Sequence, residues 1–541
     1  MMTDKRQTAR LDEQRAGHAY EIGDGVHPQA AEPPASHGMS ATGPAYAGMA
    51  SGHDMSLAPR RWTMFSVLLV GAFLPPLDFF IVNVALPSIR AELGASSSAE
   101  QLVIASYAAL YAVTLTTGGR LGDLFGRGRI FLLGLAGFAA ASALCGFAWS
   151  PWALIAGRAL QGISAAVMAP QALASVQAMF GETEKPLALG LYGAVFGLAA
   201  VIGQALGGIL ISLDVAGLGW RAIFLVNLPV AALALLFGIP LLKDGRAKDI
   251  GKLDLAGVAL SMATLAALIV PLIEGREAGW PLWSLLSLAS VPLLARLFWR
   301  HERRLARSGG APLLEPAALG APGLGRALLI ALTFHAIGAF FLLFSVYLQE
   351  ALHATALTAG LVFLPFGAGF LLGPLSTPYC RRVFGDYLNP IGMGLETAGF
   401  ICLASLIVAT PAGLPPAEGP LAAILFAIGF GQGLGLPSLM RMVTGRVVPA
   451  YSGMIAGIVS STLQVSTALS LAVIGGIFYT ALGSRTDPAA IAHAFVMAAL
   501  AIAAFLAAGT ILGVTLARPR RQLPDSWKAA DPGPAPGPAT E

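Results

Sequence analysis

Long apolar runs, separated by short polar or basic stretches, make up most of this chain. The first run extends from Trp62 to Pro87, and a run of more than about 18 apolar residues is typical of a transmembrane helix. Further runs of spanning length lie at about Gln101 to Gly118, Ile130 to Trp149, Trp152 to Met179, Leu187 to Leu213, Ala222 to Leu242, Leu255 to Ile273, Pro281 to Phe298, Ala327 to Leu348, Ala356 to Tyr379, Leu388 to Ala409, Pro420 to Met440, Gly453 to Leu482 and Ile491 to Leu516. The pattern predicts an all-α integral membrane protein with 14 transmembrane helices.

The Lys and Arg residues test this count independently, because short cytoplasmic loops carry most of these residues. They gather in alternate loops, for example at Arg60 and Arg61 and between Arg296 and Arg307. The intervening loops hold only Arg90, Arg221, Arg276 and Arg485. The alternation predicts a multi-pass protein of the cell inner or plasma membrane with both termini in the cytoplasm.

The spacing of the runs divides the chain into two six-helix bundles with two extra central helices between them. The expected parts are a disordered cytoplasmic tail at 1–60, an N-terminal six-helix bundle at 61–243, two extra transmembrane helices at 254–299, a cytoplasmic loop at 300–326, a C-terminal six-helix bundle at 327–517 and a second disordered cytoplasmic tail at 518–541. Internal repeats around a site at the membrane midplane are the usual construction of secondary transporters.

Composition agrees with a membrane protein and narrows the function. Of the 541 residues, 56% are hydrophobic and 11% are charged, whereas about 25% are charged in soluble domains. The formal net charge of +4 follows from the basic loops, so it reports membrane topology and does not indicate nucleic-acid binding. The three cysteines have no regular spacing and predict neither a disulfide framework nor a metal site.

Asp78 is the residue that most needs an explanation, because it lies inside the first apolar run. A carboxylate at the centre of a bilayer costs about 2.5 to 3.5 kcal/mol, so Asp78 should face a wet cavity or a charged partner. Arg158 and Gln161 share a helical face in the fourth run, and Arg158 lies about 9 Å below its outer end at 1.5 Å per residue. Asp78 lies about 13 Å below Pro87, so the two charges could lie at one level of the membrane. The pair would either carry protons or form a structural ion pair only.

The loop from Gly119 to Arg129 reads GRLGDLFGRGR and resembles the signature between helices two and three of the major facilitator superfamily. LDFFIVNVALP from Leu77 and GWRAIFLVNLP from Gly219 are similar to its fourteen-helix drug/proton antiporter branch, the EmrB/QacA type. The chain departs from the loop signature at Leu124 and Gly128, where the family usually has basic residues.

This resemblance implies roles for particular residues. A conformational-switch role falls on Gly119, Asp123, Gly126 and Arg127, and a role in proton coupling falls on Arg158 with Asp78. The alternative for the loop is that its arginines only anchor two helices at the membrane surface.

The fifth run carries glycines that resemble the antiporter signature of the same branch. They are Gly193, Gly197, Gly203, Gly207 and Gly208. Gln204 stands where the family has a proline. Close packing against another helix explains these glycines equally well.

Several polar residues inside the runs are candidates for the wall of a substrate cavity. They are Tyr107, Tyr111, Gln161, His335 and Glu396. Glu396 and His335 lie at similar predicted depths, where either side chain could titrate or bind a cationic substrate. The alternative is that both make ordinary buried polar contacts.

The leading hypothesis is a proton-coupled secondary transporter that exports amphipathic small molecules, a multidrug efflux antiporter. We expect a monomer whose partners are the lipid bilayer, a small-molecule substrate and protons, with the proton gradient in place of any cofactor. A dedicated metabolite or antibiotic exporter of the same fold is the alternative, followed by a transporter-like sensor or a membrane enzyme. The chain shows no HExxH motif and no nucleotide-binding loop, so we expect no enzymatic activity.

Overall fold

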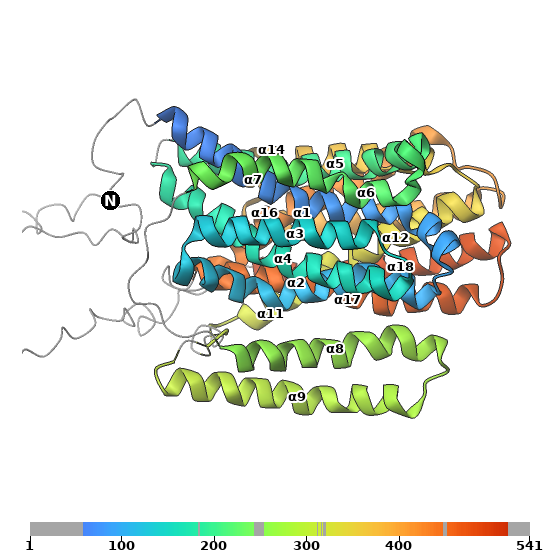
Figure 1. The fold of residues 1–541 in the computed structure, drawn as a ribbon. Helices are drawn as coiled ribbons and strands as arrows, with labels where there is room; N and C mark the ends of the chain where they lie inside the picture. The colour runs from blue at the N-terminus through green and yellow to red at the C-terminus, as the bar shows by residue number, and fades with distance from the viewer. Residues whose placement is uncertain are drawn as a thin grey trace, which may run out of the picture. The chain divides into compact units, whose positions relative to one another are not determined.

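A computed structural model describes residues 58–181, 184–242, 254–310, 312–314, 316, 321–446 and 452–517. Helices account for nearly all of them (Figure 1). The predicted C-terminal tail lies outside the described residues, and so does the N-terminal tail except for residues 58–60, where the first helix begins.

The N-terminal part of the chain forms six successive spans, which we call the first half. They are α1 (Ala58–Leu93), α2 (Ser97–Phe125), α3 (Arg127–Gly146), α4 (Pro151–Met179), α5 (Lys185–Leu213) and a broken span made of α6 (Ala222–Leu225) and α7 (Asn227–Leu241).

Two further helices, α8 (Leu255–Glu277) and α9 (Leu282–Arg307), form a hairpin beside the other helices (Figure 1). On the hairpin, α8 packs against α2 and α17, and α9 packs against α8. The last two turns of α9 extend into the segment expected to be a loop after residue 299, because its basic side chains can reach the membrane surface from a helix.

The C-terminal part, the second half, contains six more spans. They are α11 (Leu324–Phe334) with α12 (Gly338–Val346), α13 (Ala356–Val362) with α14 (Leu364–Phe384), α15 (Leu388–Ala409), α16 (Glu418–Thr444), α17 (Ser452–Leu482) and α18 (Pro488–Ala517). A 3₁₀ turn, η4 (His335–Ile337), joins α11 to α12, and a π-helical turn, η5 (Tyr347–Ala351), follows α12.

The described helices therefore make 14 spans, which confirms the predicted fold class. Eleven stretches are long and apolar enough to cross a membrane, and one of them, Ala356–Ala409, holds two successive spans. These stretches therefore hold twelve spans, and α2 and α5 bring the number of spans to 14. We call the end of the bundle where α1 begins and α18 ends the terminal end, and the opposite end the far end.

The two halves meet where α1, α2 and α5 of the first half pack against helices of the second half. Helix α5 packs against α13 and α14, α2 packs against α17, and α1 packs against α12. In the last of these contacts the rings of Phe80 and Phe341 lie 5.1 Å apart, edge to face. This seam places α1, and the acid it carries, beside the second half.

Candidate functional site

Asp78 on α1 and Arg158 on α4 form an ion pair in the interior of the first half. Neither side chain is exposed, at 0% of its surface each. The Nε atom of Arg158 also donates to the carbonyl oxygen of Val103 on α2, at 3.1 Å. The two charges lie at one level, as their depths in the sequence suggested.

Amide and hydroxyl side chains surround this pair. Gln161 donates to Oδ1 of Asp78 at 3.1 Å and to the hydroxyl of Ser142 at 2.8 Å, and its oxygen accepts from Nη1 of Arg158 at 2.8 Å. Asn227, on α7, donates to the same Oδ1 atom of Asp78 at 3.1 Å. Two helices, α4 and α7, therefore hold the Asp78 carboxylate of α1 through the side chains of Arg158, Gln161 and Asn227.

Aromatic rings cover the Arg158 guanidinium. Its carbon atom lies 4.3 Å from the ring centroid of Tyr107 and 5.9 Å from that of Phe224. The Tyr107 hydroxyl donates to the carbonyl oxygen of Pro75 at 3.2 Å, and the Tyr111 ring lies 6.1 Å from the Tyr107 ring. Both tyrosines are buried in this conformation, so their predicted place in a cavity wall stays a prediction.

The network leaves two polar atoms without a hydrogen bond among the described residues, Nη2 of Arg158 and Oδ1 of Asn227. A buried donor and a buried acceptor without partners each cost about 1 to 3 kcal/mol. Because both lie beside the Asp78 carboxylate, a rearrangement of this network can give them new partners. The network therefore contains one donor and one acceptor that different side-chain positions could pair.

The second half contains its own buried acid, Glu396 on α15, which is 0% exposed. Gln432 on α16 lies between Glu396 and His335. With its amide oriented to satisfy both neighbours, the Gln432 nitrogen donates to Glu396 at 2.7 and 3.2 Å, and its oxygen accepts from Nδ1 of His335 at 3.3 Å. The structure thus brings the two predicted polar residues into one cluster through a residue that sequence reasoning missed.

Comparison with known proteins places this arrangement in a family. The family model described as Major Facilitator Superfamily matches residues 68–415. The chain belongs to the Major Facilitator Superfamily. It is therefore a multi-pass membrane protein of a transporter family, as the loop signature suggested.

Three similar curated proteins come from Streptomyces and Amycolatopsis. A probable actinorhodin transporter of Streptomyces coelicolor is 35% identical over 429 residues, which cover 79% of this chain and 74% of the relative. A puromycin resistance protein of Streptomyces alboniger is 36% identical over 427 residues, which cover 77% of this chain and 81% of the relative. A cephamycin export protein of Amycolatopsis lactamdurans is 35% identical over 461 residues, which cover 84% of this chain and 92% of the relative.

Solved structures agree on the fold at much lower identity. A crystal structure of a POT family transporter in complex with 5-aminolevulinic acid superposes with a TM-score of 0.61 at 13% identity, covering 84% of this chain and 96% of the other. At this identity the likeness shows the fold alone.

The facilitator signature loop is shorter than the sequence suggested. Helix α2 continues to Phe125, so Gly119 and Asp123 lie within its last turns and not in a loop. Gly126 alone separates α2 from α3, with a φ of 97° that glycine adopts readily. Arg127 then donates to the carbonyl oxygen of Ala174 on α4 at 3.1 Å, which fixes the turn against a third helix.

The glycines of α5 face both halves of the facilitator fold. A methyl group at Gly203 would lie 2.8 Å from Phe80 Cβ of α1, and one at Gly208 would lie 2.5 Å from the carbonyl oxygen of Ala356 of α13. Methyl groups at Gly207 and Gly197 would likewise meet Ile81 of α1 and Leu371 of α14, while Gly193 lies within α5. Close helix packing explains these glycines, against α1 within the first half and against α13 and α14 across the seam.

A second network, which the sequence did not reveal, joins the halves at the far end. Arg90 on α1 forms an ion pair with Glu350 of η5 at 3.2 Å and lies 4.0 Å from Glu100 on α2. The Tyr479 hydroxyl of α17 donates to Glu100 at 2.7 Å. These contacts link the two halves at the far end.

The residues of the two polar clusters that sequence reasoning missed have one feature in common. Ser142, Asn227 and Gln432 are uncharged polar residues inside apolar runs, and Asn227 lies in the motif GWRAIFLVNLP itself. Each is buried. Because a buried amide needs partners, such residues can be flagged in sequence, but their partners depend on how the helices pack.

Proposed function

We propose that this protein exports amphipathic small molecules of the antibiotic class in exchange for protons. Membership of the superfamily and the export or resistance functions in the names of its relatives support this proposal. The proton gradient would be its only energy source, and we propose that the terminal end faces the cytoplasm and that the protein has no catalytic activity.

The buried Asp78–Arg158 pair is the observation that carries the proton-coupling part of the proposal. Burial disfavours a charged carboxylate, whereas a nearby guanidinium favours it, so the distance between the two groups controls whether Asp78 holds a proton. A conformational change that separates α1 from α4 would load a proton from outside. A change that brings them together, as they are in this structure, would release it.

We further propose that Glu396 and the cluster around Gln432 bind the substrate, and that cationic compounds depend on Glu396 most. Tyr107, Tyr111 and Gln161 would line the path once the Asp78 network rearranges. Asp123 and Arg127, at the junction of α2 and α3, would take part in switching between inward and outward states.

Proton flux in liposomes tests the whole proposal. Purified protein is reconstituted with a pH-sensitive dye inside, and lipophilic cations, neutral drugs and aromatic antibiotics are added in turn. We expect transported compounds to cause proton movement in the opposite direction. Transport of a compound without any proton movement would contradict the coupling, and proton movement with a single compound class would favour a dedicated antibiotic exporter.

A dedicated exporter is the second candidate because the names of the relatives each refer to one compound, such as actinorhodin, puromycin or cephamycin. A sensor or an enzyme of the same fold has no comparable support.

A further inference from the structure

The hairpin helix α9 carries an arginine stripe at its terminal end. Arg300, Arg303, Arg304 and Arg307 recur at the three- and four-residue spacing that places side chains on one side of a helix. All four are exposed. Within the part of the chain that the structure describes, none of these guanidinium groups has a hydrogen bond or an ion pair to a carboxylate.

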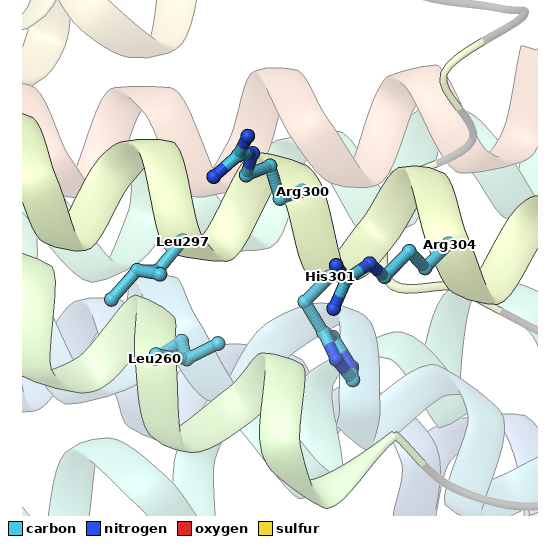
Figure 2. A pocket seen from close by; sticks show the side chains of 5 residues that line it. All are labelled: Leu260, Leu297, Arg300, His301 and Arg304. Atoms are coloured by element: carbon cyan, nitrogen blue, oxygen red, sulfur yellow. The ribbon is translucent and has the colours of Figure 1, made fainter.

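Two adjoining hollows lie along this stripe. The larger, of about 310 Å³, is lined by Arg300, Arg304 and His301 together with Leu260 of α8 and Leu297 (Figure 2). The smaller, of about 190 Å³, is lined by the four arginines alone and shares Arg300 and Arg304 with the larger. A ligand that fills both must offer a negative group to the arginines and an apolar part to the leucines.

Contacts beneath the hollow hold its wall in place. Nε2 of His301 lies 2.7 Å from Oδ1 of Asp254, which also accepts from the backbone amide of Gly257 in the first turn of α8. The neighbouring Glu302 accepts from the backbone amide of Leu314 at 2.8 Å. These contacts join α8, α9 and the following segment, so the turn that carries Arg300 and Arg304 has a fixed position.

Exposed leucines on the rest of α9 indicate which part of the membrane surrounds the arginines. Leu285, Leu286 and Leu293 are 51%, 60% and 59% exposed, and in a membrane protein such side chains contact acyl chains. The arginines at one end of the same helix then lie at the level of the lipid headgroups. Basic pockets between helices at this level bind anionic headgroups.

We propose that the α8–α9 hairpin binds an anionic phospholipid, with its phosphodiester held by Arg300 and Arg304 and an acyl chain along Leu260 and Leu297. Arginine is suited to this because its planar guanidinium donates two parallel hydrogen bonds to a phosphate. The lipid would cover part of a hairpin that packs on the bundle mainly through α8.

Native mass spectrometry of the purified full-length protein tests this site. Delipidated protein is titrated with phosphatidylglycerol, with phosphatidylcholine or with inorganic phosphate, and the fraction carrying each ligand is measured. We expect phosphatidylglycerol to bind at least about tenfold more tightly than phosphatidylcholine, since charged contacts to two arginines favour it. Equal binding of the two lipids would overturn the proposal, as would displacement of phosphatidylglycerol by equimolar inorganic phosphate.

Two double variants locate the binding. The substitutions Arg300→Gln and Arg304→Gln together should remove the preference for phosphatidylglycerol, and Arg300→Lys with Arg304→Lys should keep most of it. Arg381 and Arg382, exposed in the last turn of α14, provide a matched control, because Arg381→Gln with Arg382→Gln removes the same charge elsewhere at the terminal end. Equal loss of the preference in the control and the Arg300/Arg304 variant would also overturn the proposal.

Discussion

At the scale of single residues, the Asp78 carboxylate depends on neighbours that the sequence does not place beside it. Asn227→Ala removes one donor to Asp78 and leaves a cavity, which should lower the free energy of unfolding by about 1 to 3 kcal/mol. It should also shift the pH dependence of transport, because the ionised carboxylate would then accept one hydrogen bond fewer and be less stable.

Asn389 is the matched control for this prediction. It is equally buried, but its amide donates to the carbonyl oxygen of Gly435 in the second half, far in sequence from Asp78. Asn389→Ala should lower the free energy of unfolding by a similar amount and leave the pH profile of transport unchanged. Identical pH profiles for the two variants would show that Asn227 does not act on Asp78.

Glu396 gives a second prediction at this scale. Its carboxylate is buried beside the Gln432 amide, and the structure describes no cation paired with it. A cationic substrate would supply the missing charge, so Glu396→Gln should weaken binding of lipophilic cations at least tenfold while neutral drugs change less than threefold. Binding assays with one compound of each class decide this, and an equal loss for both would assign Glu396 a structural or proton-carrying role.

The sequence predicted the charges of the site better than its uncharged members. Asp78, Arg158 and Glu396 stand out because a charge within an apolar run requires compensation. Asn227 and Gln432 do not stand out in the same way, since a single amide in a membrane helix is tolerated at lower cost. Their roles follow only from the packing of α7 and α16 against the helices that carry the acids.

At the scale of elements, the number and order of helices could be predicted, but their ends could not. Apolar runs report the thickness of the bilayer, whereas α1 extends from Ala58 to Leu93 and α2 continues to Phe125 beyond it. The polar last turns of α2 remain helical until Gly126, where the backbone leaves the helical region. The 3₁₀ turn His335–Ile337 in the ninth span was likewise not predicted, because it lies within a continuous apolar run.

The glycines of α5 allow a test of the seam between the halves. Gly208→Ala would place a methyl group 2.5 Å from the Ala356 carbonyl oxygen, so α5 and α13 would have to separate. We expect a loss of about 1 to 3 kcal/mol in stability and slower transport. Gly476→Ala on α17 is the control, because a methyl group there meets nothing within 4 Å, and thermal unfolding of both variants compares them directly. Equal stability of the two variants would show that α5 does not need this close approach.

At the scale of the whole molecule, the far-end network should control access from that side. Arg90→Gln removes the ion pair with Glu350, so the far end should open more often and backbone amides of Tyr347–Ala351 should exchange hydrogen faster. Arg485→Gln serves as the control, since Arg485 bonds only to carbonyl oxygens of its own helix end among the described contacts. Unchanged exchange in Arg90→Gln would mean that apolar packing alone closes the far end.

The account as a whole rests on Asp78 as the proton-carrying residue. The most direct test is substrate movement in liposomes driven by a pH gradient alone, comparing the wild type, Asp78→Asn and the control Asp487→Asn, whose carboxylate caps α18 at the far end. We predict uphill transport by the wild type and the control, and no uphill transport by Asp78→Asn, although that variant still binds substrate and lets it equilibrate. Uphill transport by Asp78→Asn at a rate comparable to the wild type would contradict the account and leave the Asp78–Arg158 pair a structural role only.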